Sequence, residues 1–267
     1  MLDPLNQFIY NVLIGLWGLI PIHDLGVAII LATIIIRGAL WPLDKKALHG
    51  RKALQELQPE IGKIKEKAKG DKQVETQMIM ELYKEKEVNP FSASCLPLLL
   101  QFPILIALFQ VFMNWLRPEF LAQKTYSVVR NMPFIQEAIA NPSLFKATLF
   151  GLDLTQLGRA GLIFALFPIA AGLLQYYQTK MITPQTTGKL DDQQKMLQKF
   201  TLLGPVMIIF FGFTMPIAMS LYWGTMSLVA IAQQHLILGK DVEVLEESVP
   251  EPKEKKETKK PKKKRKK

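Results

Sequence analysis

Long blocks almost free of charge dominate this sequence, and they restrict the fold more than any other feature. A helix needs about 20 apolar residues to cross a hydrocarbon core about 30 Å thick, because every backbone polar group must be paired inside the lipid. Five blocks approach this length, the fourth being the shortest, and we expect transmembrane helices at 22–42, 92–116, 159–178, 199–213 and 217–238. The sequence therefore predicts an all-α membrane protein with five transmembrane helices.

The charged residues lie mainly between these blocks and predict the orientation of the chain. The net charge is +10 over 267 residues. Eleven Lys and Arg residues lie between the first two blocks and eleven more at 253–267, whereas 117–158 contains four. Segments rich in Lys and Arg stay in the cytoplasm, and an Arg-rich transit peptide is absent. We therefore expect a multi-pass protein of a bacterial plasma membrane, with its N-terminus outside and its C-terminus in the cytoplasm.

The first 21 residues precede the first block and contain no Lys or Arg, so they do not resemble a signal peptide. Asn6 and Asn11 contribute to a polar side, while Tyr10 and Trp17 suit a membrane interface. We expect 1–21 to form an external amphipathic helix that lies on the membrane surface. A sixth transmembrane helix is the alternative.

The segment 43–91 has the spacing of two helices. Gly70-Asp71 reads as a turn, and Pro59 is expected either to open or to kink the second part of the first helix. Apolar residues recur every three or four positions around this turn, at Leu54, Leu57, Ile61, Ile64, Ala68, Val74, Met78 and Leu82. The pattern predicts a cytoplasmic helical hairpin, which is either a solvated structure or a docking surface.

Three further segments lack long apolar blocks. We expect an external loop of short helices and turns at 117–158, because it is divided by Pro118, Pro133 and Pro142. The segment 179–198 is expected to be a flexible cytoplasmic loop. The segment 239–267 is expected to be a basic, disordered tail, because it has little apolar surface to bury. Such a tail can bind ribosomal RNA phosphates or anionic lipid, or it can simply fix the topology.

Arg37 lies in an otherwise apolar stretch that runs from Leu25 to Leu43. Twelve residues at about 1.5 Å each place it roughly 18 Å along the helix, on the cytoplasmic side of the bilayer centre. A cation at this depth costs at least about 2.5 kcal/mol unless it faces water or a partner. We therefore expect Arg37 to line a polar cavity that opens toward the cytoplasm. Snorkelling to the inner surface is the alternative.

Polar residues on other blocks can share one hydrophilic groove with Arg37. Helix positions four apart lie on one face, which places Thr33 beside Arg37 and Trp223 beside Ser227. The two glutamines of the second and third blocks can instead link helices, and the aromatic pair of the fifth can serve packing. The predicted groove residues are Arg37, Thr33, Gln101, Gln175, Tyr222, Trp223 and Ser227.

The patterns of several enzyme classes are missing. Beyond Asp24 at the start of the first, no predicted span holds a carboxylate, and the sequence has no Gly-rich phosphate loop, HExxH pattern or Cys/His metal spacing. The three histidines fall in separate boundary regions, and the lone Cys95 excludes a disulfide framework. We therefore expect no catalytic residues, no metal and no cofactor, and a protein that is not an enzyme.

Several short motifs resemble the YidC/Oxa family of membrane protein insertases in order and separation. They are Thr33–Leu43 (TIIIRGALWPL), Leu57-Gln58-Pro59, Leu82-Tyr83-Lys84, Asn89-Pro90, Cys95-Leu96-Pro97, Leu100-Gln101-Phe102-Pro103, Pro216, Leu221-Tyr222-Trp223 and Gln233-Gln234. Ser227 stands where many members have asparagine. The chain lacks the large extracytoplasmic domain of the longer members, so it is similar to the short five-span form. The resemblance implies five helices around a groove that is open to cytoplasm and lipid, closed to the outside, and independent of an energy-coupling cofactor.

The resemblance and the unpaired arginine together predict an insertase. Its groove would carry short polar tails of nascent membrane proteins across the bilayer and release their apolar segments to lipid. The expected partners are nascent membrane proteins, the bilayer, and the ribosome or anionic lipid through the basic tail; cooperation with a Sec-type translocon stays open. A small ion or polar-solute channel and a passive assembly scaffold are the alternative functions.

Overall fold

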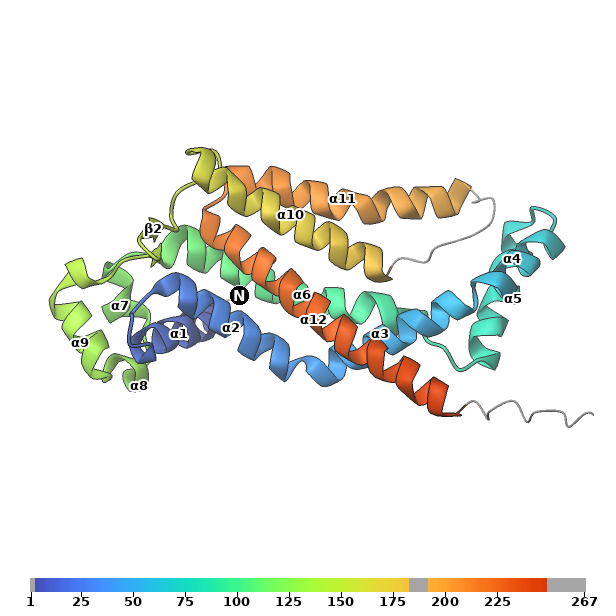
Figure 1. Cartoon of the computed structure of the whole chain (residues 1–267), viewed down its shortest axis with the longest axis horizontal. Coiled ribbons are helices and arrows are strands. Elements are labelled where there is room, and N and C mark those ends of the chain that lie inside the picture. The colour runs from blue at the N-terminus through green and yellow to red at the C-terminus, as the bar shows by residue number, and fades with distance from the viewer. Residues whose placement is uncertain (1–2, 183–191, 249–267) are drawn as a thin grey trace, which may run out of the picture.

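The computed structural model of the chain describes residues 3–182 and 192–248, and it is built almost entirely from helices (Figure 1). The described residues contain only two strands, each of two residues. The prediction of an all-α protein is therefore confirmed. The long helices are α1 (Asp3–Leu19), α2 (Leu25–Ala39), α3 (Trp41–Glu56), α6 (Pro90–Gln110), α10 (Leu162–Ile182), α11 (Asp192–Thr214) and α12 (Ile217–Ser248).

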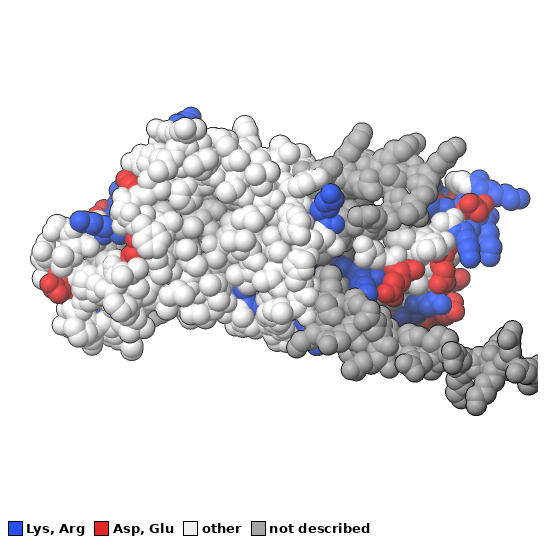
Figure 2. Space-filling view, viewed as in Figure 1, with Lys and Arg blue, Asp and Glu red and all other residues white. Residues whose placement is uncertain are grey.

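The long helices form an elongated body with different structures at its two ends. Helix α12 packs against α2 and α10, and α10 also packs against α11. Short helices follow α6 at one end, and the hairpin of α4 (Gln58–Lys67) and α5 (Lys72–Glu85) lies at the other (Figure 1). Charged residues gather toward both ends, and a broad, almost uncharged belt separates them (Figure 2). This belt has the composition of a surface that faces lipid.

Helix length and composition determine which helices could cross a membrane. Within the described ranges, Leu162–Met181 of α10 is long and apolar enough to cross a bilayer, and the bent pair α2–α3 would be a second span if it acts as one. Gln101–Trp115 and Leu203–Thr214 are shorter apolar helices. The five-span arrangement therefore stays a prediction.

The first predicted span is bent near its C-terminal end. Helix α2 ends at Ala39, Leu40 forms its C-cap, and α3 begins at Trp41 after a bend of 64°. Pro42 occupies the first turn of α3, where its missing N–H needs no partner. Helix α3 then packs against α6 and α12. The bend directs the chain out of the α2 axis and across the end of the helix body.

The segment after α3 contains a pair of helices, α4 and α5, with a small apolar core. Pro59 lies in the first turn of α4, so it opens this helix. Gly70 has a positive φ of 91°, and Asp71 caps α5 by accepting from the N–H groups of Gln73 and Val74. The apolar core of the hairpin consists of Leu57, Ile61 and Leu82, with Ile64, Ile79, Tyr83 and Val88 packed around them.

The N-terminal helix buries the side that we expected to face water. Asn6 donates to Gln110 Oε1, and Asn11 accepts from the Tyr126 N–H and donates to the Lys124 carbonyl. Tyr10 and Trp17, expected at the membrane interface, are also fully buried. The reason is tertiary: the external segment folds over α1 and supplies both hydrogen-bond partners and aromatic contacts. Its position on the membrane surface stays a prediction.

The predicted external segment is a series of short helices, three of which begin at or next to its prolines. They are α7 (Glu119–Lys124), α8 (Ser127–Arg130), α9 (Pro133–Ala140) and the 3₁₀ turn η2 (Pro142–Leu144); the π-helical turn η1 (Val111–Trp115) precedes them. An unpredicted hairpin of β1 (Thr148–Leu149) and β2 (Leu152–Asp153) turns at Phe150-Gly151. Both turn residues have positive φ.

This hairpin is fixed to the N-terminal end of α2. Asp24 caps α2 by accepting from the Val27 N–H at 3.0 Å, and its second oxygen accepts from the Phe150 N–H at 2.6 Å. Leu149 lies so close to Gly26 that a side chain there would meet it at 2.6 Å. One buried carboxylate therefore joins the start of α2 to the external segment.

Two predicted loops are shorter than expected. Helix α10 runs to Ile182 and α11 begins at Asp192, so parts of 179–198 are helical, while 183–191 lies outside the described residues. Helix α12 runs to Ser248, so 239–248 is helical rather than disordered. This stretch contains several good helix formers around Val242, Val244 and Leu245, and no proline interrupts it before Pro250. The rest of the tail, 249–267, lies outside the described residues.

Close packing among α10, α11 and α12 requires a small residue at Gly212. A Cβ at this position would lie 2.5 Å from Pro168 Cβ and 2.7 Å from Ser220 Oγ. Gly204, on the same helix, has open space within 4 Å among the described residues. Gly212→Ala is therefore expected to destabilise the protein by about 1–3 kcal/mol, the usual cost of overpacking. Thermal unfolding in detergent measures the change.

Gly204→Ala is the matched control. Alanine is a better helix former than glycine by about 1 kcal/mol, so this substitution is expected to be neutral or stabilising. Equal melting temperatures for the two variants would contradict the packing account.

Candidate functional site

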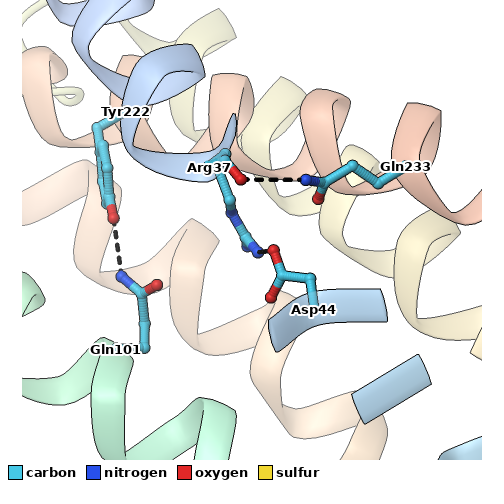
Figure 3. Close-up of polar contacts among 5 residues, drawn as sticks. All are labelled: Arg37, Asp44, Gln101, Tyr222 and Gln233. Carbon is cyan, nitrogen blue, oxygen red and sulfur yellow. Dashed lines mark hydrogen bonds and ion pairs between the residues drawn. The ribbon is translucent and has the colours of Figure 1, made fainter. Parts of the chain in front are cut away.

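Arg37 has a partner that the sequence analysis did not assign. It lies in the last turn of α2, and its Nη1 is 3.1 Å from Oδ2 of Asp44 in the first turn of α3 (Figure 3). The expectation of an unpaired arginine is therefore wrong, because Asp44 lies just beyond the predicted span and the bend at Leu40 returns it to Arg37. The two side chains keep 16% and 19% of their surface exposed, so solvent reaches the pair.

The pair lies in the wall of a cavity of about 210 Å³. At roughly 30 Å³ for each water, this volume suits several water molecules. Residues of α2, α3, α6, α10 and α12 form the wall. Its polar lining combines three ionisable side chains with four amides, namely Arg37, Asp44, Arg51, Gln101, Gln178, Gln233 and Gln234.

Three buried polar atoms of this lining have no hydrogen-bond partner within the described part of the chain. They are one donor, Arg37 Nε, and two acceptors, Gln178 Oε1 and Gln234 Oε1. A buried polar atom without a partner costs about 1–3 kcal/mol. The cavity is therefore better suited to a polar guest than to an apolar one.

Two hydrogen bonds connect the cavity wall across helices (Figure 3). Gln233 Nε2 donates to the carbonyl of Arg37 at 3.3 Å, which joins α12 to α2. The last carbonyls of a helix lack partners in their own helix, so Gln233 satisfies one that the bend leaves free. Gln101 Nε2 donates to the Tyr222 hydroxyl at 2.8 Å and joins α6 to α12.

The predicted groove residues separate into different environments. Arg37 and Gln101 line the cavity, whereas Thr33 and Tyr222 border a smaller, mainly apolar space of about 20 Å³. The Thr33 hydroxyl donates to the Ile29 carbonyl at 2.7 Å within its own helix, so it is already satisfied. Sharing a helix face with Arg37 therefore does not by itself place a residue in the wall of the larger cavity.

The other three predicted residues contribute to helix packing. The Ser227 hydroxyl donates to Gln175 Oε1 at 2.9 Å and joins α12 to α10. Trp223 belongs to the main apolar core and is only 9% exposed. Gln175, Trp223 and Ser227 are absent from the described wall of the large cavity. Their structural environment favours the alternative of interhelical contact.

The sequence analysis did not select Asp44, Arg51 or Gln178 for this site. Arg37, Asp44 and Arg51 are spaced seven residues apart, which is close to two helical turns. Burial lowers the pKa of Arg51, Asp44 opposes this effect, and Arg37 adds to it. Arg51 still carries its charge at neutral pH, because the ordinary pKa of arginine is above 12. The seven-residue spacing is the sequence signal that could have identified Asp44 and Arg51.

A helical body with an uncharged belt is typical of an α-helical membrane protein. In this protein the body also has a cavity lined by charged side chains. The sequence model of the 60Kd inner membrane protein family matches residues 19–243. The chain is 32% identical over 219 residues to the membrane protein insertase YidC of Fusobacterium nucleatum, covering 82% of this chain and 88% of that protein. It is 34% identical over 224 residues to YidC of Clostridium tetani, covering 84% of each.

Longer relatives share the same region. The chain is 32% identical over 216 residues to the membrane protein insertase YidC of Aeromonas salmonicida, which covers 81% of this chain but 33% of that protein. The chain therefore belongs to the 60Kd inner membrane protein family, the YidC/Oxa1 family.

The two neighbouring glutamines of α12 allow a test of the cavity wall. Gln234→Leu removes an acceptor that lacks a partner among the described residues, so it is expected to raise the free energy of unfolding by about 1 kcal/mol. Gln233→Leu removes the bond to the Arg37 carbonyl and is expected to lower it by a similar amount. Denaturant or thermal unfolding in one detergent measures both. Equal effects of the same sign would contradict this description of the wall.

Proposed function

We propose that this protein is a membrane protein insertase that moves short polar tails of nascent membrane proteins through the cavity beside Arg37. Its family membership supports insertion as the activity, since several relatives are named membrane protein insertases. One structural observation supports the route: a solvent-accessible cavity lined by charges and amides lies at the end of α2, inside an otherwise apolar helix body. The site of action would be a bacterial plasma membrane.

The energetic problem for such a client lies in its polar tail. Its apolar segment gains about 25 cal/mol for each Å² that leaves water for lipid. The tail, in contrast, carries peptide groups that lose about 2–7 kcal/mol each when they enter hydrocarbon without partners. A polar cavity shortens the dry part of the path. The insertase therefore needs no chemical step, only replacement of the tail's hydrogen bonds.

The cavity offers both donors and acceptors for this replacement. The Arg37 guanidinium can donate to a tail carbonyl or carboxylate, and the amide groups of Gln178 and Gln234 can accept from tail N–H groups once they turn into the cavity. The hydrogen bonds of Gln101 and Gln233 hold α6 and α2 against α12, which keeps the wall in place. The tail would be solvated transiently while the apolar segment moves along the uncharged belt into lipid.

The remaining parts of the proposal concern topology and partners. The N-terminus would lie outside, with the external segment covering α1, and the α4–α5 hairpin would lie in the cytoplasm. The charge distribution supports this orientation, since the basic residues concentrate around the hairpin and at 253–267. The basic tail would contact the ribosome or anionic lipid, and a Sec-type translocon would be an additional partner for some clients.

Reconstitution in lipid vesicles tests the function directly. Purified protein is supplied with freshly translated single-span clients that carry short acidic tails, and translocation is measured by protease protection. Arg37→Ala is expected to reduce insertion about tenfold, because a cavity cation is replaced by an apolar group. Arg117→Ala is the matched control, since this arginine is 65% exposed and is not among the residues that line the cavity; it should retain full insertion.

Each alternative function predicts a different result. Ion or solute flux without client insertion would support a channel, and client binding without insertion would support an assembly scaffold. Equal insertion by Arg37→Ala and wild-type protein, over several clients, would contradict the role of the cavity.

A further inference from the structure

Asp44 occupies the position on Arg37 that an acidic client tail would seek. Its Oδ2 lies 3.1 Å from Arg37 Nη1. The proposed function explains why a cation stands beside the cavity, but it does not explain a carboxylate on the same wall. The resident anion must influence which tails can bind.

The fold keeps Asp44 at this place independently of Arg37. Asp44 lies in the first turn of α3, where the helix dipole favours a negative charge. The bend of 64° and the packing of α3 against α6 and α12 fix this turn at the end of α2. The carboxylate therefore stays in the cavity wall when its bond to Arg37 opens.

The pair is also easy to open. Both side chains are partly exposed, and ion pairs that solvent reaches contribute little net stability because water replaces much of what is lost. Asp44 engages Nη1, while Nε of the same guanidinium has no partner among the described residues. A client carboxylate therefore has to compete with Asp44 for the part of the guanidinium that solvent reaches.

The charges around the cavity act differently on acidic and basic tails. Arg37 and Arg51 contribute two positive charges, and Asp44 contributes one negative charge to the same wall. A tail carboxylate is attracted by the arginines but repelled by Asp44, with which it competes. A tail ammonium is repelled by the arginines and attracted by Asp44. Without Asp44 the wall would discriminate strongly against basic tails.

We infer that Asp44 is a built-in counter-ion that sets the charge selectivity of the cavity, weakening the preference for acidic tails and admitting basic ones. This inference rests on the proposed function and assigns a specificity-determining role to a residue outside the predicted groove. Asp44 orients Arg37 and offsets part of its positive charge. It is not itself required for a polar tail to bind.

The test uses client tails of equal length that carry net charges of −2, 0 or +2. Insertion into vesicles is measured for wild-type protein, Asp44→Asn and Asp44→Glu. Asp44→Asn keeps the shape and removes the charge, so the ratio of acidic-tail to basic-tail insertion is expected to rise about fivefold, the size expected for one partly exposed charge. Asp44→Glu keeps the charge and should keep the wild-type ratio.

A second measurement separates this inference from the proposed function. The affinities of the acidic and basic tail peptides for each variant in nanodiscs are measured alongside insertion, and the same change in their ratio is expected. If wild-type protein inserts no client, the proposed function fails while the peptide ratio still decides the role of Asp44. In an Arg37→Ala background the effect of Asp44→Asn on acidic peptides should shrink, because the position for which Asp44 competes is gone.

Two outcomes would overturn the inference. If Asp44→Asn lowers insertion and binding of acidic and basic tails by the same factor, Asp44 only supports the α2–α3 bend. If Asp44→Asn leaves both peptide affinities and both insertion levels unchanged, the carboxylate has no influence on the cavity.

Discussion

The 64° bend between α2 and α3 is the constraint on which the cavity depends. A guanidinium at the end of an apolar helix must meet water, an anion or hydrogen-bond acceptors, and here the 64° bend supplies the anion while keeping the pair partly exposed. Gln233 then binds the Arg37 carbonyl that the bend leaves at the helix end. The same local break thus provides the partner, opens the wall and creates the contact with α12.

The polar atoms of the wall have a cost that the rest of the structure must offset. Arg37 Nε, Gln178 Oε1 and Gln234 Oε1 lack partners among the described residues, whereas Thr33, Gln175 and Ser227 on neighbouring surfaces are satisfied by close bonds. A protein selected only for stability would satisfy or remove these atoms. Three of the six such atoms among the described residues line this one cavity, which favours a transient polar guest there.

The sequence predicted a helical protein and singled out Arg37, because a cation in an apolar stretch is anomalous whatever the fold. It missed Asp44 because composition placed the end of the span at Pro42 and does not reveal a bend. It could not exclude Ser227 and Gln175 from the groove. Whether two polar side chains bond to each other or line a cavity depends on how their helices pack, which the sequence does not show. The β-hairpin at 148–153 escaped because two-residue strands have no periodicity to detect.

Photo-crosslinking of a ribosome-bound client tests the route of the tail most directly. A photoreactive residue replaces either Gln178, in the cavity wall, or Val206, on α11 and 59% exposed. The account predicts that the polar tail of a client arrested during insertion crosslinks to position 178 and not to position 206. Crosslinks of the tail at position 206 with none at position 178 would contradict passage through the cavity.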